Sequence, residues 1–494
     1  MSKKYVSTRG HQEPLNFYQS ILQGIGSDGG LLVPDFDFEK KDLNKLVNLS
    51  YIDLATEIIS SFVDEEGYDD IHRCCENAYG TGLFVEGIVP VEKAGDVYIA
   101  ELFHGQTAAF KDMALSILPH FITLSLKKMK EDREVMILTA TSGDTGKAAL
   151  EGFKDVEGTS IKVFYPDEGV SPIQKQQMVS QTGNNVEVIG IVGNFDDAQS
   201  AVKKAFNSEK LKELCDEHHV FLSSANSINI GRLIPQVVYY FYSYFNLVSN
   251  KVIELGDEVN FTIPSGNFGN ALAGYIAYNM GLPIKTFVCA SNKNNILTDF
   301  FNSGKYDANR EFYKTNAPAM DILVSSNLER LVYLFTDGNG ELVEEYMNKL
   351  NTTGVYEVEE DVFNKISSKF KAGWINEDEV IETIGECYKE NDYLLDTHTA
   401  VGYGVYKRYR QASGDSTPTI ILSTASPYKF PESVYKAITG KTLGEYEAID
   451  AVNEETGVPI PEPLVGIKDR EVLHKLVIDK EDIVDFIGER VKGK

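Results

Sequence analysis

The sequence predicts an α/β fold with open, mostly parallel, twisted sheets that carry helices on both faces. From Glu134 onward, short β-branched runs alternate with helical segments, which is the pattern of βαβ units. The runs are almost continuously apolar, as is typical of parallel strands covered on both faces. Most of the runs end in a turn rich in Gly, Ser or Asn that opens a helix. Because ligands in such folds bind at the carboxyl ends of strands, these turns are where a site is expected.

The expected strands and helices alternate along the chain. The strands are predicted at 135–140, 161–165, 186–191, 220–224, 261–264, 286–290 and 419–423. Helices are predicted between them at 146–153, 173–181, 196–206, 228–248 and 270–280.

Three regions are expected. Residues 1–90 are richer in helical periodicity, for example at 43–63, and predict an N-terminal subdomain. Residues 91–440 predict the catalytic α/β region in two lobes, with an acidic, helix-rich insertion at about 307–392. Helices inside this insertion are expected at 329–335, 341–350 and 378–391. Residues 441–494 mix proline with charge and predict a C-terminal extension on the surface.

Composition excludes several classes of protein. The chain has 494 residues, 43% of them hydrophobic, which is enough for large cores. A net charge of −27 argues against nucleic acid or an anionic membrane as the main partner. The first residues have no apolar signal core, so we expect a cytoplasmic protein. We expect its partner to be a small-molecule substrate. The five cysteines and eight histidines show no metal-binding spacing, so no metal site is expected.

One lysine stands in an unusual place. The run 107–115 is small and apolar apart from Lys111 and Asp112, and we expect it to be helical. Burial of an ammonium is costly, so Lys111 either reaches water or has lost its charge. A neutral lysine is a nucleophile toward aldehydes. Taken alone, the segment favours a solvated lysine, and only the other motifs change that balance.

Two turns have the features of anion sites. The turn 264–270 follows a strand and precedes a helix, where backbone amides can hold a phosphate, although an ordinary capped turn is equally consistent with it. The turn 139–148 contains Gly146-Lys147, but its spacing does not match a Walker A loop. It is dense in hydroxyls and amides, which suits a carboxylate better than a nucleotide.

Two further strand ends carry polar groups. The turn 223–232 combines hydroxyls and amides with Arg232, which suits a second anion, although pairing with a surface carboxylate is the common alternative. The segment 422–427 ends the last strand with neutral hydroxyls. Such a hydroxyl can hydrogen-bond a ring nitrogen without forcing it to stay protonated.

Taken in order, these motifs resemble those of one family, the threonine synthases, within the fold-type II (tryptophan synthase β-like) pyridoxal-phosphate enzymes. The segment 101–112 is similar to the family's cofactor-lysine segment and 265–270 to its phosphate loop. The turn 142–146 is similar to its substrate-carboxylate loop, and 226–232 to a stretch typical of threonine synthases. Residues 8–10 and 28–34 resemble its N-terminal region, so the resemblance covers almost all of 5–435.

The resemblance implies a carbon–oxygen lyase that converts O-phospho-L-homoserine and water to L-threonine and phosphate, the last step of threonine biosynthesis. Lys111 would bind pyridoxal 5'-phosphate and then shuttle protons at Cα and Cβ. Thr424 would face the ring nitrogen, and the cofactor phosphate would be held by Gly266, Asn267, Phe268, Gly269 and Asn270. The substrate carboxylate would be held by Ser142, Gly143, Asp144 and Thr145, with Asp144 contributing mainly its backbone amide. The substrate phosphate would be held by Arg232 with Asn226, Ser227 and Asn229, and Lys147 and Lys175 are second choices.

The chain departs from the family pattern at one motif. Longer members often carry Thr-Ala-His-Pro-Ala-Lys-Phe near the cofactor ring, whereas this chain has Ser426 at the histidine position. The role of that histidine is therefore not carried over. Two alternatives stay open: a phospho-lyase or dehydratase of the same fold that releases a 2-oxo acid, and a non-catalytic paralogue. A monomer and a homodimer are both consistent with the sequence.

Overall fold

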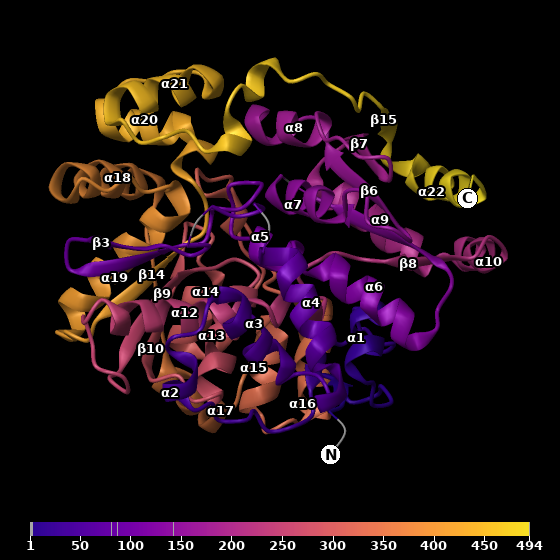
Figure 1. The fold of residues 1–494 in the computed structure, drawn as a ribbon, viewed down its shortest axis with the longest axis horizontal. Helices are drawn as coiled ribbons and strands as arrows, with labels where there is room; N and C mark the ends of the chain where they lie inside the picture. The colour runs from indigo at the N-terminus through magenta and orange to yellow at the C-terminus, as the bar shows by residue number, and fades with distance from the viewer. Residues whose placement is uncertain (1–2, 81, 86, 142, 494) are drawn as a thin grey trace.

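Two sheets form the framework of the computed structural model, which describes residues 3–80, 82–85, 87–141 and 143–493 (Figure 1). The large sheet has the order β13-β10-β9-β14-β4-β3 and the small sheet the order β15-β7-β6-β5-β8. Every neighbouring pair in both sheets is parallel except β3 with β4. The predicted open, mostly parallel sheets are confirmed.

The seven predicted strands all form, with small differences at their ends. The small sheet contains β5 (Glu134–Ala140), β6 (Thr159–Pro166), β7 (Val186–Val192), β8 (Val220–Ser223) and β15 (Val477–Asp479). The large sheet contains β3 (Val91–Ala94), β4 (Val97–Glu101), β9 (Val259–Pro264), β10 (Ile284–Ser291), β13 (Phe370–Trp374) and β14 (Thr419–Ser423). Two antiparallel ribbons are β1 (Tyr5–Ser7) with β2 (Leu32–Pro34) and β11 (Lys305–Asp307) with β12 (Val355–Glu357).

Helices cover both faces of the small sheet, in the upper right of Figure 1. Met136 and Leu138 of β5 pack against α9, α10 and α22, while Val135 and Ile137 lie in the main core with α6, α7 and α8. This alternation is the period of two that a strand imposes on its side chains. The helices are α5 (Asp112–Leu115), α6 (Leu118–Met129), α7 (Asp144–Phe153), α8 (Pro172–Val179), α9 (Phe195–Asn207), α10 (Glu209–Glu217) and α22 (Ile483–Lys492).

The large sheet is covered in the same way. Ile420 and Leu422 of β14 lie in the main core with α12, α13 and α14, and Ile421 packs on the other face with α18 and α19. The helices are α11 (Ile230–Leu233), α12 (Gln236–Ser249), α13 (Gly269–Asn279), α14 (Ile296–Ser303), α18 (Glu377–Asn391) and α19 (Thr397–Ser413). Around them lie α15 (Leu328–Phe335), α16 (Gly340–Thr353), α17 (Glu360–Lys369), α20 (Pro431–Thr439) and α21 (Glu445–Thr456).

The N-terminal residues are part of the main core. They form α1 (Phe17–Gln23), α2 (Leu43–Leu46), α3 (Tyr51–Ser60) and α4 (Tyr68–Tyr79). Tyr5, Phe17 and Ile58 share one apolar cluster with residues of both sheets. Within the ranges given above, no helix is long and apolar enough to cross a membrane.

Two predicted helices are interrupted. The stretch 43–63 splits into α2 and α3 because Ser50 caps a new helix, its side chain accepting a hydrogen bond from the backbone N–H of Asp53. The stretch 228–248 splits into α11 and α12 at Pro235, which has no backbone N–H to donate. The insertion predicted as helix-rich also contributes a strand, β13, to the edge of the large sheet.

Candidate active site

The predicted site turns all follow the carboxyl ends of strands. The loop that carries Lys111 follows β4, the turn 265–268 follows β9, and Thr424 follows β14. On the small sheet, the turn 141–143 follows β5 and the turn 224–229 follows β8. The two sheets therefore bring the turns to one region between them, as the rule for parallel sheets predicts.

The segment before Lys111 is a series of turns with one bridge residue, and Ala108 has φ +57°, so the expectation of a helix over 107–115 is wrong for most of it. Ala109 forms an antiparallel bridge with Ala425, and the backbone N–H of Phe110 donates to Thr424 O at 2.8 Å. The helix α5 begins only at Asp112, with Lys111 at its cap. This pairing between distant segments overrides local helix propensity, and it places Lys111 beside Thr424.

Asp112 shapes the turn that leads into Lys111. Its buried carboxylate accepts from the backbone N–H of Thr107 at 2.8 Å and from the Thr107 hydroxyl at 2.7 Å. Burial raises the pKa of Asp112 to about 6, against the lowering effect of these two donors. A Cβ on Gly105 would lie 2.5 Å from Asp112 Oδ2, so a larger residue there would displace the carboxylate.

Lys111 lies in a nearly closed environment. Its side chain is 13% exposed, and its Nζ lies 3.8 Å from Asp144 Oδ2 and 5.5 Å from the centre of the Phe110 ring. Burial lowers the pKa of Lys111, Asp144 opposes this change, and the neighbouring cations Arg232 and Lys429 add to it. A larger share of Lys111 is therefore the neutral amine, which is the nucleophilic form.

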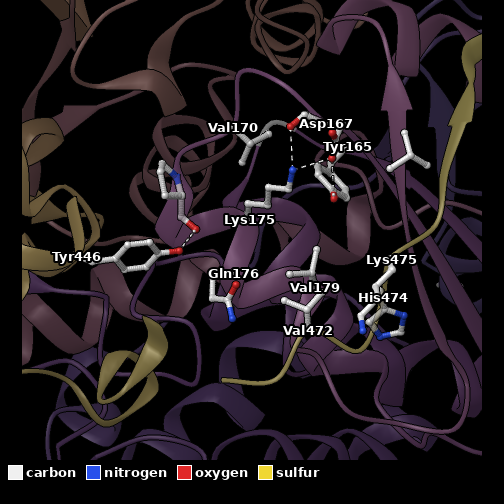
Figure 2. Close-up of a pocket in the computed structure, with 12 residues that line it drawn as sticks. Tyr165, Asp167, Val170, Lys175, Gln176, Val179, Tyr446, Val472, His474 and Lys475 are labelled. Atoms are coloured by element: carbon white, nitrogen blue, oxygen red, sulfur yellow. Dashed lines mark hydrogen bonds and ion pairs between the residues drawn. The ribbon is translucent and has the colours of Figure 1, made fainter. Parts of the chain in front are cut away.

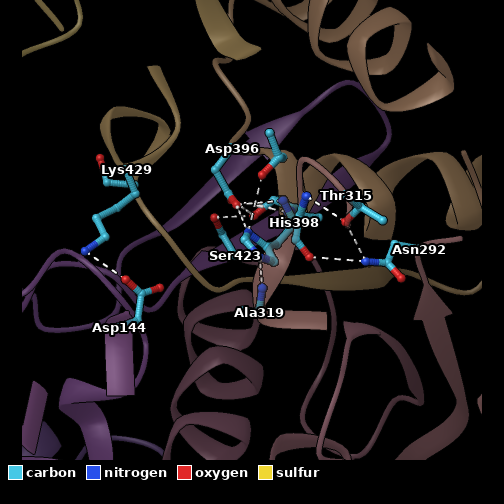
Figure 3. A network of polar contacts seen from close by, with 12 residues as sticks. Asp144, Asn292, Thr315, Ala319, Asp396, His398, Ser423 and Lys429 are labelled. Atoms are coloured by element: carbon cyan, nitrogen blue, oxygen red, sulfur yellow. Dashed lines mark hydrogen bonds and ion pairs between the residues drawn. The ribbon is translucent and has the colours of Figure 1, made fainter. Parts of the chain in front are cut away.

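Lys429, which follows β14 of the large sheet, holds Asp144, which follows β5 of the small sheet (Figure 3). The fully buried Nζ of Lys429 lies 2.9 Å from Asp144 Oδ1 and also donates to Gln177 Oε1. Gln174 Nε2 donates to the same Asp144 oxygen at 2.8 Å. Burial alone would raise the pKa of Asp144, but Lys429, Lys111 and Gln174 together hold it well below its usual range. Asp144 is thus a fixed charge between two lysines.

The turn before α7 is shaped by one hydroxyl. Thr141 Oγ1 accepts from the backbone N–H of Gly143 at 3.0 Å and of Gly146 at 2.9 Å. Gly143 has φ +150°, and a Cβ there would lie 2.5 Å from the Gln174 side chain. Thr145 is half-buried at the start of α7. Ser142 lies outside the described residues.

The turn before α13 presents unpaired backbone donors. Among the described residues, no protein acceptor is recorded for the backbone N–H groups of Gly266, Asn267, Phe268, Gly269 or Asn270. Phe268 has φ +65°, which turns the chain sharply into the helix. The Asn270 side chain closes the turn, accepting from Ser265 Oγ at 2.7 Å and donating to Pro264 O at 2.9 Å. Such free donors at a helix start attract an anion.

Arg232 is a buried cation that pairs with no carboxylate of the described residues. Its side chain is 4% exposed, and within the described part of the chain its one recorded bond runs from a terminal nitrogen to Ala225 O at 3.0 Å. Its buried Nε has no hydrogen-bond partner among the residues that the structure describes. Burial lowers the pKa of Arg232 to about 10. An uncompensated buried guanidinium is costly to the fold, and an anion would satisfy it.

Asn229 and its neighbours position Arg232. Asn229 Oδ1 accepts from the backbone N–H of Gly231 at 2.9 Å, and Asn229 Nδ2 donates to Ile21 O at 3.0 Å. The oxygen and the nitrogen of this amide therefore both bond to the backbone, and Asn229 caps the start of α11. Asn226 is half-buried and accepts from the backbone N–H of Ser227 at 2.7 Å.

Thr424 presents a hydroxyl for which no partner is recorded among the described residues, although its side chain is nearly buried. Its neighbour Ser423 lies 2.8 Å, oxygen to oxygen, from Thr399, and Thr399 donates to Asp396. Ser426, at the family's histidine position, caps the short turn after it by accepting from Tyr428 N.

A buried histidine extends this network toward residue 319 (Figure 3). His398 Nε2 accepts from the backbone N–H of Ala319 at 3.0 Å, so the proton is on Nδ1, 3.1 Å from Asp396 Oδ1. The ring of Phe430 packs against His398 with the centroids 4.8 Å apart. A Cβ on Gly266 would lie 2.7 Å from Ala319 O, so this network borders the turn before α13.

The two second-choice lysines are engaged by carboxylates. Lys147 pairs with Glu151 at 2.8 Å. Lys175 pairs with Asp167 at 2.6 Å on the wall of a surface cavity of about 390 Å³ (Figure 2). This cavity lies between α8 and the C-terminal extension, and apart from Lys175 it contains none of the predicted site residues.

Sequence reasoning missed several residues of this region. Lys429 and Gln174 hold Asp144, and Asn327 and Arg330 contact two of the turns. None of them stands in a Gly-rich or hydroxyl-rich turn at a strand end, so the pattern that found the other residues could not find these. Only Lys429 could have been found from the sequence, because it occupies the lysine position of the family motif Thr-Ala-His-Pro-Ala-Lys-Phe, which corresponds to 424–430 here.

Two family models match the chain. The model described as "Threonine synthase N terminus" matches residues 4–79, and "Threonine synthase, C-terminal" matches residues 399–487. The threonine synthase of Pseudomonas aeruginosa is 37% identical over 89% of this chain and 91% of its own length. The threonine synthase of Saccharomyces cerevisiae is 36% identical over 92% of each chain. Human threonine synthase-like 1 is 38% identical over 90% of this chain, which spans 62% of that protein's length.

Solved structures show the same similarity. The structure of pyridoxal-phosphate-bound threonine synthase from Brucella melitensis superposes with a TM-score of 0.87 at 35% identity, covering 100% of this chain and 99% of that one. The structure of yeast threonine synthase superposes with a TM-score of 0.88 at 32% identity, covering 99% of both chains.

Proposed function

The chain belongs to the threonine synthase family, and we propose that it converts O-phospho-L-homoserine and water to L-threonine and phosphate with pyridoxal phosphate. The predicted family and the fold-type II architecture are confirmed by these relatives. The observation that carries the proposed activity is the position of Lys111. Its amine is buried, has a lowered pKa and lies in the region where the turns before α11 and α13 meet. Within the described residues, the Nε of Arg232 and the backbone N–H groups of 266–270 have no protein acceptor.

The residues present fit the cofactor. Within the described part of the chain, the N–H groups of 266–270 and the hydroxyl of Thr424 have no protein partner, so they suit its phosphate and its ring nitrogen. The amine of Lys111 suits its aldehyde. When bound, pyridoxal phosphate supplies an electron sink for negative charge at the substrate's Cα. The protein contributes orientation and proton transfer.

Lys111 moves the protons. Once displaced by the substrate's amine, it is a neutral base that takes the proton from Cα. After it has given that proton up, it is neutral again and takes one from Cβ as the bond from Cγ to the phosphate oxygen breaks. Asp144, 3.8 Å away, stabilises the ammonium that results, and Lys429 keeps that carboxylate ionised. The ammonium can then return a proton to Cγ, which becomes the methyl group, and water adds its hydroxyl at Cβ while Cα regains its proton. One side chain thus serves both carbons.

The anion sites orient the substrate. Arg232 is proposed to hold the phosphate that leaves from Cγ, because its buried Nε has no partner in the described chain and phosphate accepts from a guanidinium at two positions. The backbone of Gly143, Asp144 and Thr145, with Ser142, is proposed to hold the carboxylate. Asn226 and Ser227 are proposed to bind the same phosphate together with Arg232, and Asn229 caps the helix that carries Arg232.

The product identifies the reaction. We expect the purified protein with pyridoxal phosphate to release phosphate and L-threonine from O-phospho-L-homoserine in a 1:1 ratio, measured by phosphate assay and chromatography of amino acids. A 2-oxo acid in place of threonine would instead establish the phospho-lyase reaction. If neither product forms while the cofactor is bound, the chain is a non-catalytic member of the family.

Replacing Lys429 by methionine is expected to slow cofactor capture by Lys111. The change removes a cation that lowers the pKa of Lys111 and leaves Asp144, which raises it, without its main partner. The pKa of Lys111 therefore rises, and less neutral amine is present at a given pH. We expect the pH midpoint of the rate of pyridoxal phosphate binding to the cofactor-free protein to move up by about one unit.

A matched control is Lys285→Met. It breaks a lysine–aspartate pair with Asp415, 2.8 Å long, at the opposite, amino-terminal end of β10. This variant should bind the cofactor with an unchanged pH midpoint. An unchanged or lower midpoint in Lys429→Met would contradict the assigned electrostatics.

A further inference from the structure

Asn327 is a fully buried residue that touches two turns at once. Its Nδ2 donates to Asn267 O at 3.1 Å, in the turn before α13, and to Ser227 O at 3.2 Å, in the turn that leads to Arg232. Its backbone N–H adds a second bond to Asn267 O at 3.0 Å. The two hydrogens of one amide thus join the turn proposed for the cofactor phosphate to the turn proposed for the substrate phosphate.

Arg330 holds Asn327 in this orientation. The fully buried guanidinium donates to Asn327 Oδ1, to Ile228 O and, at 3.0 Å from its Nε, to Leu32 O. Because an amide oxygen that accepts from a guanidinium cannot exchange places with the amide nitrogen, the Nδ2 of Asn327 must face the two turns. Burial lowers the pKa of Arg330 to about 9, which means that desolvation of this cation reduces the free energy of unfolding.

The N-terminal ribbon supports the same helix. Glu329, next to Arg330, accepts from the Thr8 hydroxyl at 2.6 Å and from Arg9 Nε at 3.0 Å. Arg330 itself reaches Leu32 on β2. The start of α15 is therefore held by residues 8 and 9, which directly follow β1, and by β2, while Asn327 just before it contacts the two turns. Ser325, just before it, donates to Gly266 O at 2.7 Å.

We propose that Asn327 and Arg330 are positioning residues that fix the two phosphate-binding turns relative to each other, so that cofactor and substrate phosphates bind at a set separation. The inference rests on the proposed function, because it assigns one phosphate to each turn. Neither residue reaches a reacting atom in this assignment. Their effect is transmitted through the carbonyls of Asn267, Ser227 and Ile228, whose positions set the directions of the neighbouring N–H groups and of Arg232.

The variant that tests this is Asn327→Asp. It keeps the size of the side chain and the acceptor for Arg330, and it replaces the donor that faces two carbonyl oxygens with an oxygen. Both side-chain contacts with the turns are lost, the backbone bond to Asn267 O stays, and the new carboxylate gains an ionic partner in Arg330, so the fold should survive. We expect KM for O-phospho-L-homoserine and the rate at which the loaded protein loses pyridoxal phosphate on dialysis to rise together, each about tenfold.

The matched control is Asn185→Asp. The Nδ2 of Asn185 also bridges backbone carbonyls, donating to Phe153 O at 2.8 Å and Thr159 O at 3.1 Å, but outside the site. This variant should lower the melting temperature without moving KM or cofactor loss. Asn327→Ala, in which the donor is simply absent, should reproduce both changes of Asn327→Asp.

The result has two readings. A joint rise in KM and cofactor loss for the Asn327 variants, with neither in Asn185→Asp, supports the coupling. A change in only one of the two quantities, or in the melting temperature alone, overturns it. Failure of the proposed function would be seen in the unsubstituted protein, which would form no threonine. Failure of this inference is seen only when the variants are compared with that protein.

Discussion

Replacing Lys111 by alanine is expected to lower kcat for threonine formation by about 10³-fold or more, the largest effect of any single substitution in this chain. The amine is assigned both the covalent attachment of the cofactor and proton transfer at Cα and Cβ, and positioned general acid–base catalysis alone contributes about 10²–10⁴-fold. Residual activity is to be measured with pyridoxal phosphate in excess, so that weaker attachment does not mask the catalytic loss.

Lys128→Ala is the control for Lys111. The ammonium of Lys128 also lies over an aromatic ring, 5.9 Å from the centre of Tyr18, and beside a carboxylate, 2.5 Å from Asp70, but on the outer end of α6. Its loss should leave kcat within twofold. Borohydride treatment of the unsubstituted loaded protein should fix the cofactor to the peptide that contains Lys111. Full activity in Lys111→Ala, or a label on another lysine, would contradict the assignment of Lys111 as the lysine that binds the cofactor.

Replacing Arg232 by methionine is expected to raise KM for O-phospho-L-homoserine by about 10–100-fold with a much smaller change in kcat. A charge-assisted hydrogen bond to phosphate contributes about 1.5–3 kcal/mol, and the buried guanidinium makes one recorded protein contact, to Ala225 O. Inorganic phosphate should lose affinity as a competitive inhibitor by a similar factor. Cofactor content, read from its absorbance, should stay close to that of the unsubstituted protein.

The same substitution should stabilise the protein when no ligand is present. Burial lowers the pKa of Arg232 to about 10, which means that the folded state disfavours its charge at neutral pH. Methionine fills similar space without that cost, so the melting temperature of the ligand-free variant should rise. Arg133→Met, which removes a surface arginine paired with Glu131 at 2.8 Å, should change neither KM nor cofactor content. Equal loss of cofactor and substrate affinity in Arg232→Met would reassign Arg232 to the cofactor.

The main strands could be predicted because their information is local. Runs such as 135–140 are apolar over their whole length and end in a turn, and each formed with ends shifted by at most two residues. The short strands β1, β2, β3, β4, β11, β12, β13 and β15 were not predicted. β13, with the sequence Phe-Lys-Ala-Gly-Trp, has no β-branched residue, and it is defined by its pairing with β10 rather than by its own preference.

The site divides in the same way. The turns at 265–270 and 224–232 are recognisable because each combines flexible residues with donors in one short stretch. The shape around Lys111 was not recognisable, because it depends on the bridge between Ala109 and Ala425. The partners of Asp144 and of the Asn327 amide are likewise brought in by the fold from distant parts of the chain. A single sequence carries no signal for such pairings.

The bridge between residues 108–110 and 424–426 also has a consequence for how the protein is made. A ribosome produces Lys111 early, but the segment that orients it is translated more than 300 residues later. At about 5–20 residues per second, the emerging chain spends tens of seconds with Lys111 already made and the segment that pairs with 108–110 still missing. We therefore expect the cofactor to bind only after residues 424–426 have been translated. Chains that end before residue 424 should leave the ribosome without bound cofactor.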